Sequence, residues 1–292
     1  MPSLKVPPGT PKPRFASLDE EIERYDLKEH IAELDEQGLC IVPFAKLQVG
    51  SDFVARAREA LLGVAKRRLG VDFEAVDDPA QAVSVKAENK GQYILSHLLH
   101  EGGIFEEIYV NPIRRTIMRH LLGDVHRMST GNGWVKVKTP EAHEGPLTTA
   151  LHADTVGPTP WPLAEPHVAN MNWILTDYAK EHGAFAYVPG SHRRGAQPGP
   201  EAVEAAVPVE APAGSLFFFH GATWHGSFRK KTEGLRLSIH GLCCRPYYLP
   251  QQDYRGRVAP EIFERSADPE YLKMLVGEND PWLQKKPQVQ WI

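Results

Sequence analysis

Cysteine is scarce in this 292-residue chain, and its scarcity excludes two kinds of small-protein scaffold. The three cysteines, two of them adjacent at Cys243 and Cys244, are too few for a disulfide framework and lack the paired spacing of a structural zinc site. We therefore expect unpaired thiols that are buried as small apolar side chains.

Long apolar runs and an excess of basic residues are also missing. No run approaches the roughly 18 apolar residues of a membrane helix, and the opening MPSLKVPPGTPKPR lacks the apolar centre of a secretory signal. With a formal net charge of -4, the chain has no basic footprint for nucleic acid and no polybasic segment for a membrane surface. We expect a cytoplasmic protein, a monomer or homodimer, that acts on a small molecule.

Hydrophobic residues and histidine are plentiful by contrast. Hydrophobic residues make up 42% of the chain, enough for a sizeable core, and the 13 histidines carry the side chain that most often binds metals. We expect a flexible N-terminal arm over residues 1–15 and a single domain over residues 16–292. Within that domain, a helical part spans 16–125, a β core 126–248 and a C-terminal extension 249–292.

The helical part shows its periodicity in three places. LDEEIERYDLKEHIAELDEQ, at 18–37, has helical spacing and is closed by Gly38 before the apolar run LCIVPF, which predicts a strand. Residues 52–68 predict a second amphipathic helix. Residues 94–123 predict one or two more, interrupted by glycine and proline.

The pattern changes to short strands after Gly123. Alternating or continuous apolar segments occur at 134–138, 168–177, 215–219 and 235–242, separated by glycine and proline turns. Such strands favour a mainly β sandwich or barrel with flanking helices over a parallel α/β sheet. The segment 194–214, rich in Pro, Ala and Gly, predicts a loop over one end of the strands.

Two histidines and one carboxylate are candidates for a metal site. His152 and Asp154 lie two residues apart in TTALHADTVG, so on a strand both project to the same face. That pair alone also fits a structural hydrogen bond. A third ligand, His225 in HGATWHGS, would complete two imidazoles and one carboxylate on one face of a metal, the arrangement of non-haem Fe(II) oxygenases. His220 in the same tract competes with His225.

Arg236 is a candidate anion anchor. Alternation in LRLSIH places Arg236, Ser238 and His240 on one face of a strand. A guanidinium that faces a barrel interior needs an anion, and its planar fork suits a carboxylate, to which Ser238 could add a hydroxyl. Lys136 and Lys138, in WVKVK, are interpreted instead as part of a solvated strand face, with contact to an acidic substrate as the alternative.

The order of these motifs resembles the phytanoyl-CoA dioxygenase-like Fe(II)/2-oxoglutarate-dependent oxygenases. The resemblance rests on LHAD, on GAFAYVPGSHRRG at 183–195, and on GSLFFFHGATWHGS followed by Arg236, and it covers residues 130–245. It implies a double-stranded β-helix, or jelly-roll, and a dioxygenase that uses Fe(II), 2-oxoglutarate and O2. His152, Asp154 and His225 would be the iron ligands, with His225 preferred to His220 for its spacing from Arg236, which would grip 2-oxoglutarate.

The chain departs from the resembled pattern at two positions. Thr149 stands where many relatives carry a glutamine that reaches the co-substrate, and its hydroxyl could still donate a shorter-range hydrogen bond. Phe185 stands where relatives often have a smaller residue. Two other classes of function stay open: a non-catalytic metal-binding β-barrel, and a hydrolase that uses a metal-activated water, in which Arg236 would have no obvious task.

Overall fold

The computed structural model describes residues 16–75, 91–156 and 165–279, and these residues contain two antiparallel sheets. The six-stranded sheet has the order β1-β8-β5-β10-β3-β2, and the four-stranded sheet has the order β4-β9-β6-β7. The strands of the first are β1 (Leu39–Val42), β2 (Gln92–Leu95), β3 (Arg127–Lys136), β5 (Val168–Ile174), β8 (Leu216–His220) and β10 (Arg236–Cys244). Those of the second are β4 (Leu147–His152), β6 (Phe185–Tyr187), β7 (Val207–Pro208) and β9 (His225–Phe228).

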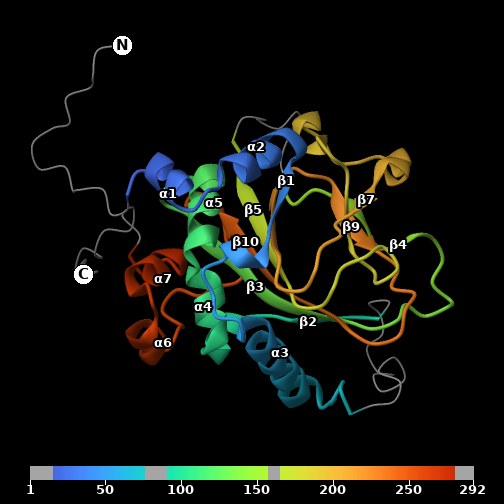
Figure 1. Cartoon of the computed structure of the whole chain (residues 1–292), viewed down its shortest axis with the longest axis horizontal. Helices are drawn as coiled ribbons and strands as arrows, with labels where there is room; N and C mark the ends of the chain where they lie inside the picture. The colour runs from blue at the N-terminus through green and yellow to red at the C-terminus, as the bar shows by residue number, and fades with distance from the viewer. Residues whose placement is uncertain (1–15, 76–90, 157–164, 280–292) are drawn as a thin grey trace, which may run out of the picture.

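Helices gather on the side of the six-stranded sheet that faces away from the four-stranded one (Figure 1). They are α1 (Leu18–Arg24), α2 (Lys28–Gln37), α3 (Phe53–Leu69), α4 (Ile104–Val110), α5 (Pro112–Leu122), α6 (Pro260–Arg265) and α7 (Pro269–Leu275). Short 3-10 turns occur at Phe44–Lys46, Leu98–Glu101, Ser191–Arg194 and Pro200–Ala205. Together with the sheets, these helices confirm the expected mainly β class with flanking helices.

Side-chain alternation along β10 separates the core from the interior between the sheets. Leu237 and Ile239 are fully buried in the main hydrophobic cluster under the helices. Trp173 of the neighbouring β5 joins that cluster and packs on Phe53 of α3, with ring centroids 4.4 Å apart. Because neighbours on a strand point to opposite faces, Arg236 and the other even-numbered residues of β10 point the other way.

Side chains of β3, β5 and β10 therefore lie in rows across the interior face, each row made of register partners. Leu242 of β10 pairs with Thr130 of β3 and Asn170 of β5, and two residues further along β10 His240 pairs with Asn132 and Asn172. Ser238 pairs with Trp134 and Ile174. Arg236 pairs with Lys136 in the last row. The interior thus changes from polar and uncharged at one end to doubly cationic at the other.

The helix predicted over 18–37 is two helices in the structure. A capping box at Ser17 starts α1, and α2 ends at Gly38, as predicted; Gly38 has the left-handed conformation. The break falls at Asp26, whose φ of 51° is incompatible with a continuous helix. The helical spacing of the sequence continues across Asp26, so the periodicity alone could not reveal the break.

Two further segments differ from their predictions. Gln92–Leu95, which overlaps the start of a predicted helical stretch, is the edge strand β2 and pairs with β3. The segment 194–214 does lie largely outside the sheets, but it also contains the turn Pro200–Ala205 and the short strand β7. The predicted arm at 1–15 lies outside the described residues, and the domain boundaries stay a prediction.

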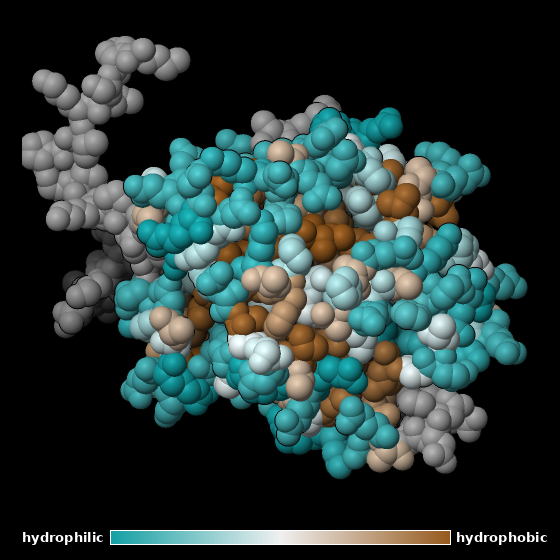
Figure 2. All heavy atoms as spheres, viewed as in Figure 1, coloured by the Kyte–Doolittle hydropathy of each residue, from teal (hydrophilic) through white to brown (hydrophobic). Residues whose placement is uncertain are grey.

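Surface and core agree with the composition. Cys40, Cys243 and Cys244 are buried and unpaired, as expected. Among the described residues, no helix combines the length and apolar character needed to cross a membrane. Figure 2 shows a face that is mostly hydrophilic, with hydrophobic residues visible between the polar ones in several places.

Candidate active site

A cavity of about 250 Å³ lies between the two sheets and contains most of the predicted site residues. It is lined by Gln92, Thr130, Asn132, Trp134, Thr149, His152, Asp154, Asn170, Phe185, Phe219, His225, Gly226, Ser227, Arg236, His240, Leu242 and Gln251. Both sheets contribute to this lining. The cavity is therefore the place where side chains distant in sequence can act on one molecule.

His152, Asp154 and His225 come together at one wall of the cavity. Each offers a ligand atom, and the three atoms lie within 4.8 Å of one another. The Asp154 carboxylate is 3.8 Å from His152 Nε2 and 3.5 Å from His225 Nε2. His152 and His225 face each other as partners in β4 and β9, and Asp154 follows on the chain leaving β4.

An irregularity in β4 sets this geometry. Thr149 pairs with Ser227 and His152 with His225, so β4 uses three residues where β9 uses two. Such a bulge turns residues three apart toward the same face. Thr149 and His152 consequently both line the cavity, which a regular strand would not allow.

Hydrogen bonds orient all three candidate ligands. The Nδ1 atoms of His152 and His225 lie 3.0 Å from the Ala150 carbonyl and 2.9 Å from the Thr223 carbonyl. A neutral imidazole that donates from Nδ1 keeps the Nε2 lone pair for a metal. Asn170 donates to Asp154 Oδ2 at 2.5 Å and fixes the carboxylate.

Burial favours the neutral, metal-binding form of His225. It is the largest cause that lowers the pKa of this imidazole, and the opposing effect of Asp154 is smaller. Two neutral imidazoles and one carboxylate on one side of a point form the donor set of a facial metal triad with its other side open. The residues present therefore fit a divalent transition metal such as Fe(II).

Arg236 lies at the cationic end of the cavity with no acidic partner among the described residues. Its Nη1 donates to the Gly183 carbonyl at 2.6 Å, and its guanidinium carbon lies 4.5 Å from the centre of the Tyr178 ring. The buried Nε has no hydrogen-bond acceptor. A buried guanidinium without a carboxylate is costly, so this end of the cavity suits an anionic group of a ligand.

Comparison with known proteins decides the family. The model of the phytanoyl-CoA dioxygenase family matches residues 34–238, which is more than half of the chain and includes all four residues just described. The chain belongs to the phytanoyl-CoA dioxygenase family. The resemblance drawn from LHAD, the PGSH turn and Arg236 is thereby confirmed.

The relatives of this chain include named dioxygenases. Dioxygenase af480 of Aspergillus fumigatus is 29% identical over 163 residues, which is 55% of this chain and 51% of that protein. The uncharacterized protein Rv1501 of Mycobacterium tuberculosis is 35% identical over 86 residues, 29% of this chain and 32% of that protein. The chain thus spans about half of the length of the first relative and about a third of the second.

Solved structures share the fold. HygX from Streptomyces hygroscopicus, solved with nickel and 2-oxoglutarate, has a TM-score of 0.58 at 16% identity and covers 80% of this chain and 93% of its own. The α-ketoglutarate-dependent epimerase SnoN of nogalamycin biosynthesis has a TM-score of 0.55 at 21% identity, covering 78% of this chain and 87% of its own. The expected jelly-roll core is confirmed by this similarity.

Thr149 and Ser238, the other two residues predicted to bind the co-substrate, differ in position. Thr149 lines the cavity, and its hydroxyl accepts a hydrogen bond from Gln92 Nε2 at 3.2 Å. Ser238 is fully buried behind Arg236, 3.4 Å from its Nη2 and 2.9 Å from His240 Nε2. Ser238 therefore holds Arg236 and His240 in place and is not part of the cavity lining.

Ser227 and Gln92 are among the lining residues that escaped prediction. Ser227 lies two residues beyond His225 in β9, so the alternation that links His152 to Asp154 would also have placed it on the cavity face. Gln92 gave no such signal, because its short edge strand has no clear period.

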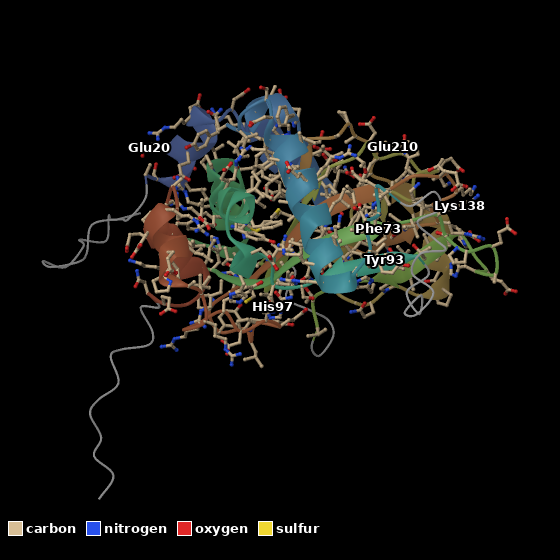
Figure 3. The ribbon with its side chains drawn as sticks, turned by 90° about the horizontal axis from the view of Figure 1, so that it is seen from below. Glu20, Phe73, Tyr93, His97, Lys138 and Glu210 are labelled. Carbon is tan, nitrogen blue, oxygen red and sulfur yellow. The ribbon has the colours of Figure 1, made fainter. Side chains whose placement is uncertain are left out.

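Lys136 contradicts its predicted place on a solvated strand face. Its side chain is fully buried and contacts the four-stranded sheet. Lys138 does fit the prediction: it is 40% exposed, pairs with Glu233 at 2.5 Å, and lies at the edge of the molecule (Figure 3). Alternation cannot distinguish these two lysines, because residues two apart share a face. The difference is that the four-stranded sheet covers Lys136 and does not cover Lys138.

His220, the competing ligand, lies outside the triad. It ends β8, its Nδ1 accepts from the Ala222 amide at 3.0 Å, and its ring centre is 5.2 Å from that of His192. Burial lowers the pKa of His220 to about 3, so this imidazole stays neutral. The structure brings His225 to His152 and Asp154, and places His220 against the PGSH turn.

Aromatic side chains frame the candidate metal site. Phe185 stacks on His225 with ring centres 5.2 Å apart and an interplanar angle of 12°, and Phe219 lies 4.6 Å from the same ring. Trp134 lines the cavity and stacks on His240 at 5.2 Å, whereas Trp173 is core.

Proposed function

We propose that this chain is a non-haem Fe(II)- and 2-oxoglutarate-dependent dioxygenase that hydroxylates an unactivated C–H bond of a small, uncharged organic molecule. One observation carries the proposal. The ligand atoms of His152, Asp154 and His225 meet in the same cavity as a buried Arg236 that has no acidic partner among the described residues. Family membership and the dioxygenase names of relatives support it.

Each of these residues has a distinct task. His152, Asp154 and His225 would hold the iron, and Asp154 as a third protein ligand favours hydroxylation over halogenation, which needs a vacated position for halide. Arg236 would bind the distal carboxylate of 2-oxoglutarate, with Thr149 near the co-substrate. Bound iron and 2-oxoglutarate would supply the oxidation, in which O2 is consumed, succinate and CO2 are released, and one oxygen atom enters the substrate.

The uncharged end of the cavity indicates the substrate class. Apart from the triad and Arg236, its described lining carries only neutral side chains, with histidine counted as neutral. Asn132 Oδ1 accepts from Gln252 Nε2 at 2.7 Å, because Gln252 Oε1 already accepts from the Gly131 amide and the Tyr254 hydroxyl. The Asn132 NH2 group is therefore left to donate into the cavity. A neutral substrate with an oxygen acceptor fits this wall.

Hydroxylation is the simplest outcome for this site. The similar structures include an epimerase, SnoN, and a carbocyclase, SnoK, so the shared fold supports other oxidations as well. Product mass separates them: hydroxylation adds one oxygen atom, epimerisation leaves the mass unchanged and ring closure removes two hydrogens. A succinate-release screen over neutral metabolites, followed by mass spectrometry, measures both the substrate class and the outcome.

The cofactor proposal is tested without a substrate. Fe(II) and 2-oxoglutarate added anaerobically to the wild-type protein are expected to give a visible charge-transfer band. We expect Asp154→Ala to lose the band and Arg236→Ala to need far more 2-oxoglutarate to reach it. His120→Ala, in α5 and outside the cavity lining, is the control. A wild-type protein with neither band nor 2-oxoglutarate affinity would favour a non-catalytic β-barrel or, if it binds zinc, a hydrolase.

A further inference from the structure

Lys136 is a buried cation that the proposed reaction leaves without a task. Its side chain is fully buried, and none of the described acidic residues lies within ion-pair distance of its Nζ. Lysine is rarely buried to this extent unless a carboxylate accompanies it. Burial, and then the positive charges of Arg236 and Lys230, lower the pKa of Lys136.

The hydrogen bonds of Lys136 tie it to the cavity wall. Its Nζ donates to Ser227 Oγ at 2.5 Å, Thr148 Oγ1 at 2.7 Å and the Phe228 carbonyl at 2.6 Å, with the Gly183 carbonyl further away at 3.4 Å. These acceptors use its three protons, and Lys136 itself is not part of the cavity lining. Ser227, which does line the cavity, is its route to a ligand.

Arg236 and Lys136 form a pair of like charges. They are register partners in β10 and β3, and both approach the carbonyl oxygen of Gly183. Lys230 lies nearby as a third cation, and its ammonium is held by Thr232 and the Glu233 carbonyl. Two acidic side chains of this region have other partners: Glu233 pairs with Lys138, and Asp154 lies with the candidate metal ligands.

An external anion is the partner that this arrangement lacks. Two buried positive charges with only neutral oxygens between them repel each other, and a carboxylate at the same end of the cavity relieves both. The Ser227 hydroxyl accepts from the Lys136 ammonium, and its own proton has long contacts of 3.4 Å, to Gln92 Oε1 and the Phe228 carbonyl. A carboxylate in the cavity is the stronger acceptor for that proton. A hydroxyl that accepts from a cation is also a stronger donor.

We propose that Lys136 is a positioning residue for the co-substrate: it orients Ser227 as a donor and adds a second positive charge beside Arg236, so that the site selects a 2-oxo diacid over a 2-oxo monoacid. This inference rests on the proposed function. Lys136 acts through Ser227 and its charge, and does not itself touch the co-substrate.

The test compares two 2-oxo acids that differ only at the distal end. Wild type and Lys136→Met are titrated anaerobically, in the presence of Fe(II), with 2-oxoglutarate and with 2-oxopentanoate, which has a methyl group in place of the distal carboxylate. We expect Lys136→Met to raise the Kd of 2-oxoglutarate about ten-fold or more and to leave that of 2-oxopentanoate nearly unchanged. Lys138→Met, two residues beyond the end of β3 and paired with Glu233 at the surface, should change neither Kd.

Further variants separate positioning from structural support. Ser227→Ala should give the same selective loss, and in the Lys136→Met background it should add little, because both act on one hydrogen bond. Without ligand, Lys136→Met should melt no lower than wild type, because it removes an unpaired buried charge. If Lys136→Met fails to fold, Ser227→Ala alone still measures the selective loss.

The other outcomes overturn the inference in distinguishable ways. Equal 2-oxoglutarate affinity in wild type and Lys136→Met would show that the lysine has no part in binding. Equal weakening of both acids with a lower melting temperature would show a merely structural lysine. A wild-type protein that binds neither acid would instead overturn the proposed function, and this inference with it.

Discussion

Asn170 shows how a single hydrogen bond prepares the candidate metal site. Its amide donates to the Asp154 carboxylate at 2.5 Å from the neighbouring sheet. We expect Asn170→Ala to weaken Fe(II) binding about 10–100-fold, the usual effect of removing a partner that orients a metal ligand. Metal titration in the absence of co-substrate measures this.

The matched control for Asn170 lies two residues along the same strand. Asn172 points to the same interior face, and neither polar atom of its amide has a hydrogen-bond partner in the part of the chain that the structure describes. Asn172→Ala should therefore leave Fe(II) affinity unchanged. Equal losses in both variants would mean that Asn170 supports the strand rather than the carboxylate.

Single residues were predictable from the sequence where one rule sufficed. Alternation and motif order placed His152, Asp154, His225 and Arg236 correctly in a common cavity. The same rules failed for Lys136, because its burial depends on the second sheet, which no local pattern records. Its residue type then favoured a solvent-exposed position, as it does for most lysines.

Gly226 governs the fit between two elements, β4 and β9. It lies opposite the bulge that turns Thr149 and His152 to the same side, and a Cβ there would collide with the Thr149 carbonyl oxygen. We expect Gly226→Ala to push β4 outward, lower the melting temperature and weaken Fe(II) binding, since the two imidazoles come from these two strands.

Gly63, on the helical side, provides the comparison. A Cβ at this position of α3 meets at closest the flexible end of Arg67, and alanine is the better helix former. Gly63→Ala should keep or raise the melting temperature and bind Fe(II) normally. Normal Fe(II) binding by a stable Gly226→Ala would show that the bulge tolerates the methyl group and does not set the imidazole geometry.

Elements were predicted best where their pattern was local and long. The helix expected over 52–68 is α3 at Phe53–Leu69, and each expected strand of the core overlaps an observed strand. The β2 strand was missed because four residues at a sheet edge have too little periodicity to outweigh the helical stretch that follows. The bulge in β4 also has no sequence signature, since it arises from pairing with a distant strand.

At the scale of the whole molecule, His126 links global stability to pH. It is fully buried between β3 and the helices, with Nδ1 2.9 Å from the Gly123 carbonyl and Nε2 2.9 Å from the Tyr271 hydroxyl. Burial lowers its pKa to about 3. The unfolded chain, with a histidine pKa of about 6.5, binds a proton between these values that the folded chain does not.

Stability should therefore fall as pH drops below about 6.5, by about 1.4 kcal/mol per pH unit from this residue alone. We expect wild type to lose more stability than His126→Gln between pH 7 and pH 5, by about 2 kcal/mol, in urea unfolding. Other titrating groups, such as His220, are common to both proteins and cancel. An equal loss in both would contradict a buried neutral His126.

The architecture could be predicted in kind but not in arrangement. Short alternating strands after a helical segment indicated a β sandwich or barrel, and two antiparallel sheets are present. The order β1-β8-β5-β10-β3-β2 mixes strands from both ends of the chain, which follows from the burial of many side chains at once and not from any one segment.

The candidate metal ligands His152 and His225 belong to one sheet, and Arg236 to the other. The distance between the two sheets therefore fixes the length of any molecule that must reach from the metal to the guanidinium. Mutations in the core under the helices, such as at Trp173 or Phe53, would change that distance slightly without touching the cavity. Selection for a bound molecule of a different length would then change residues of the hydrophobic core, far from the candidate metal ligands.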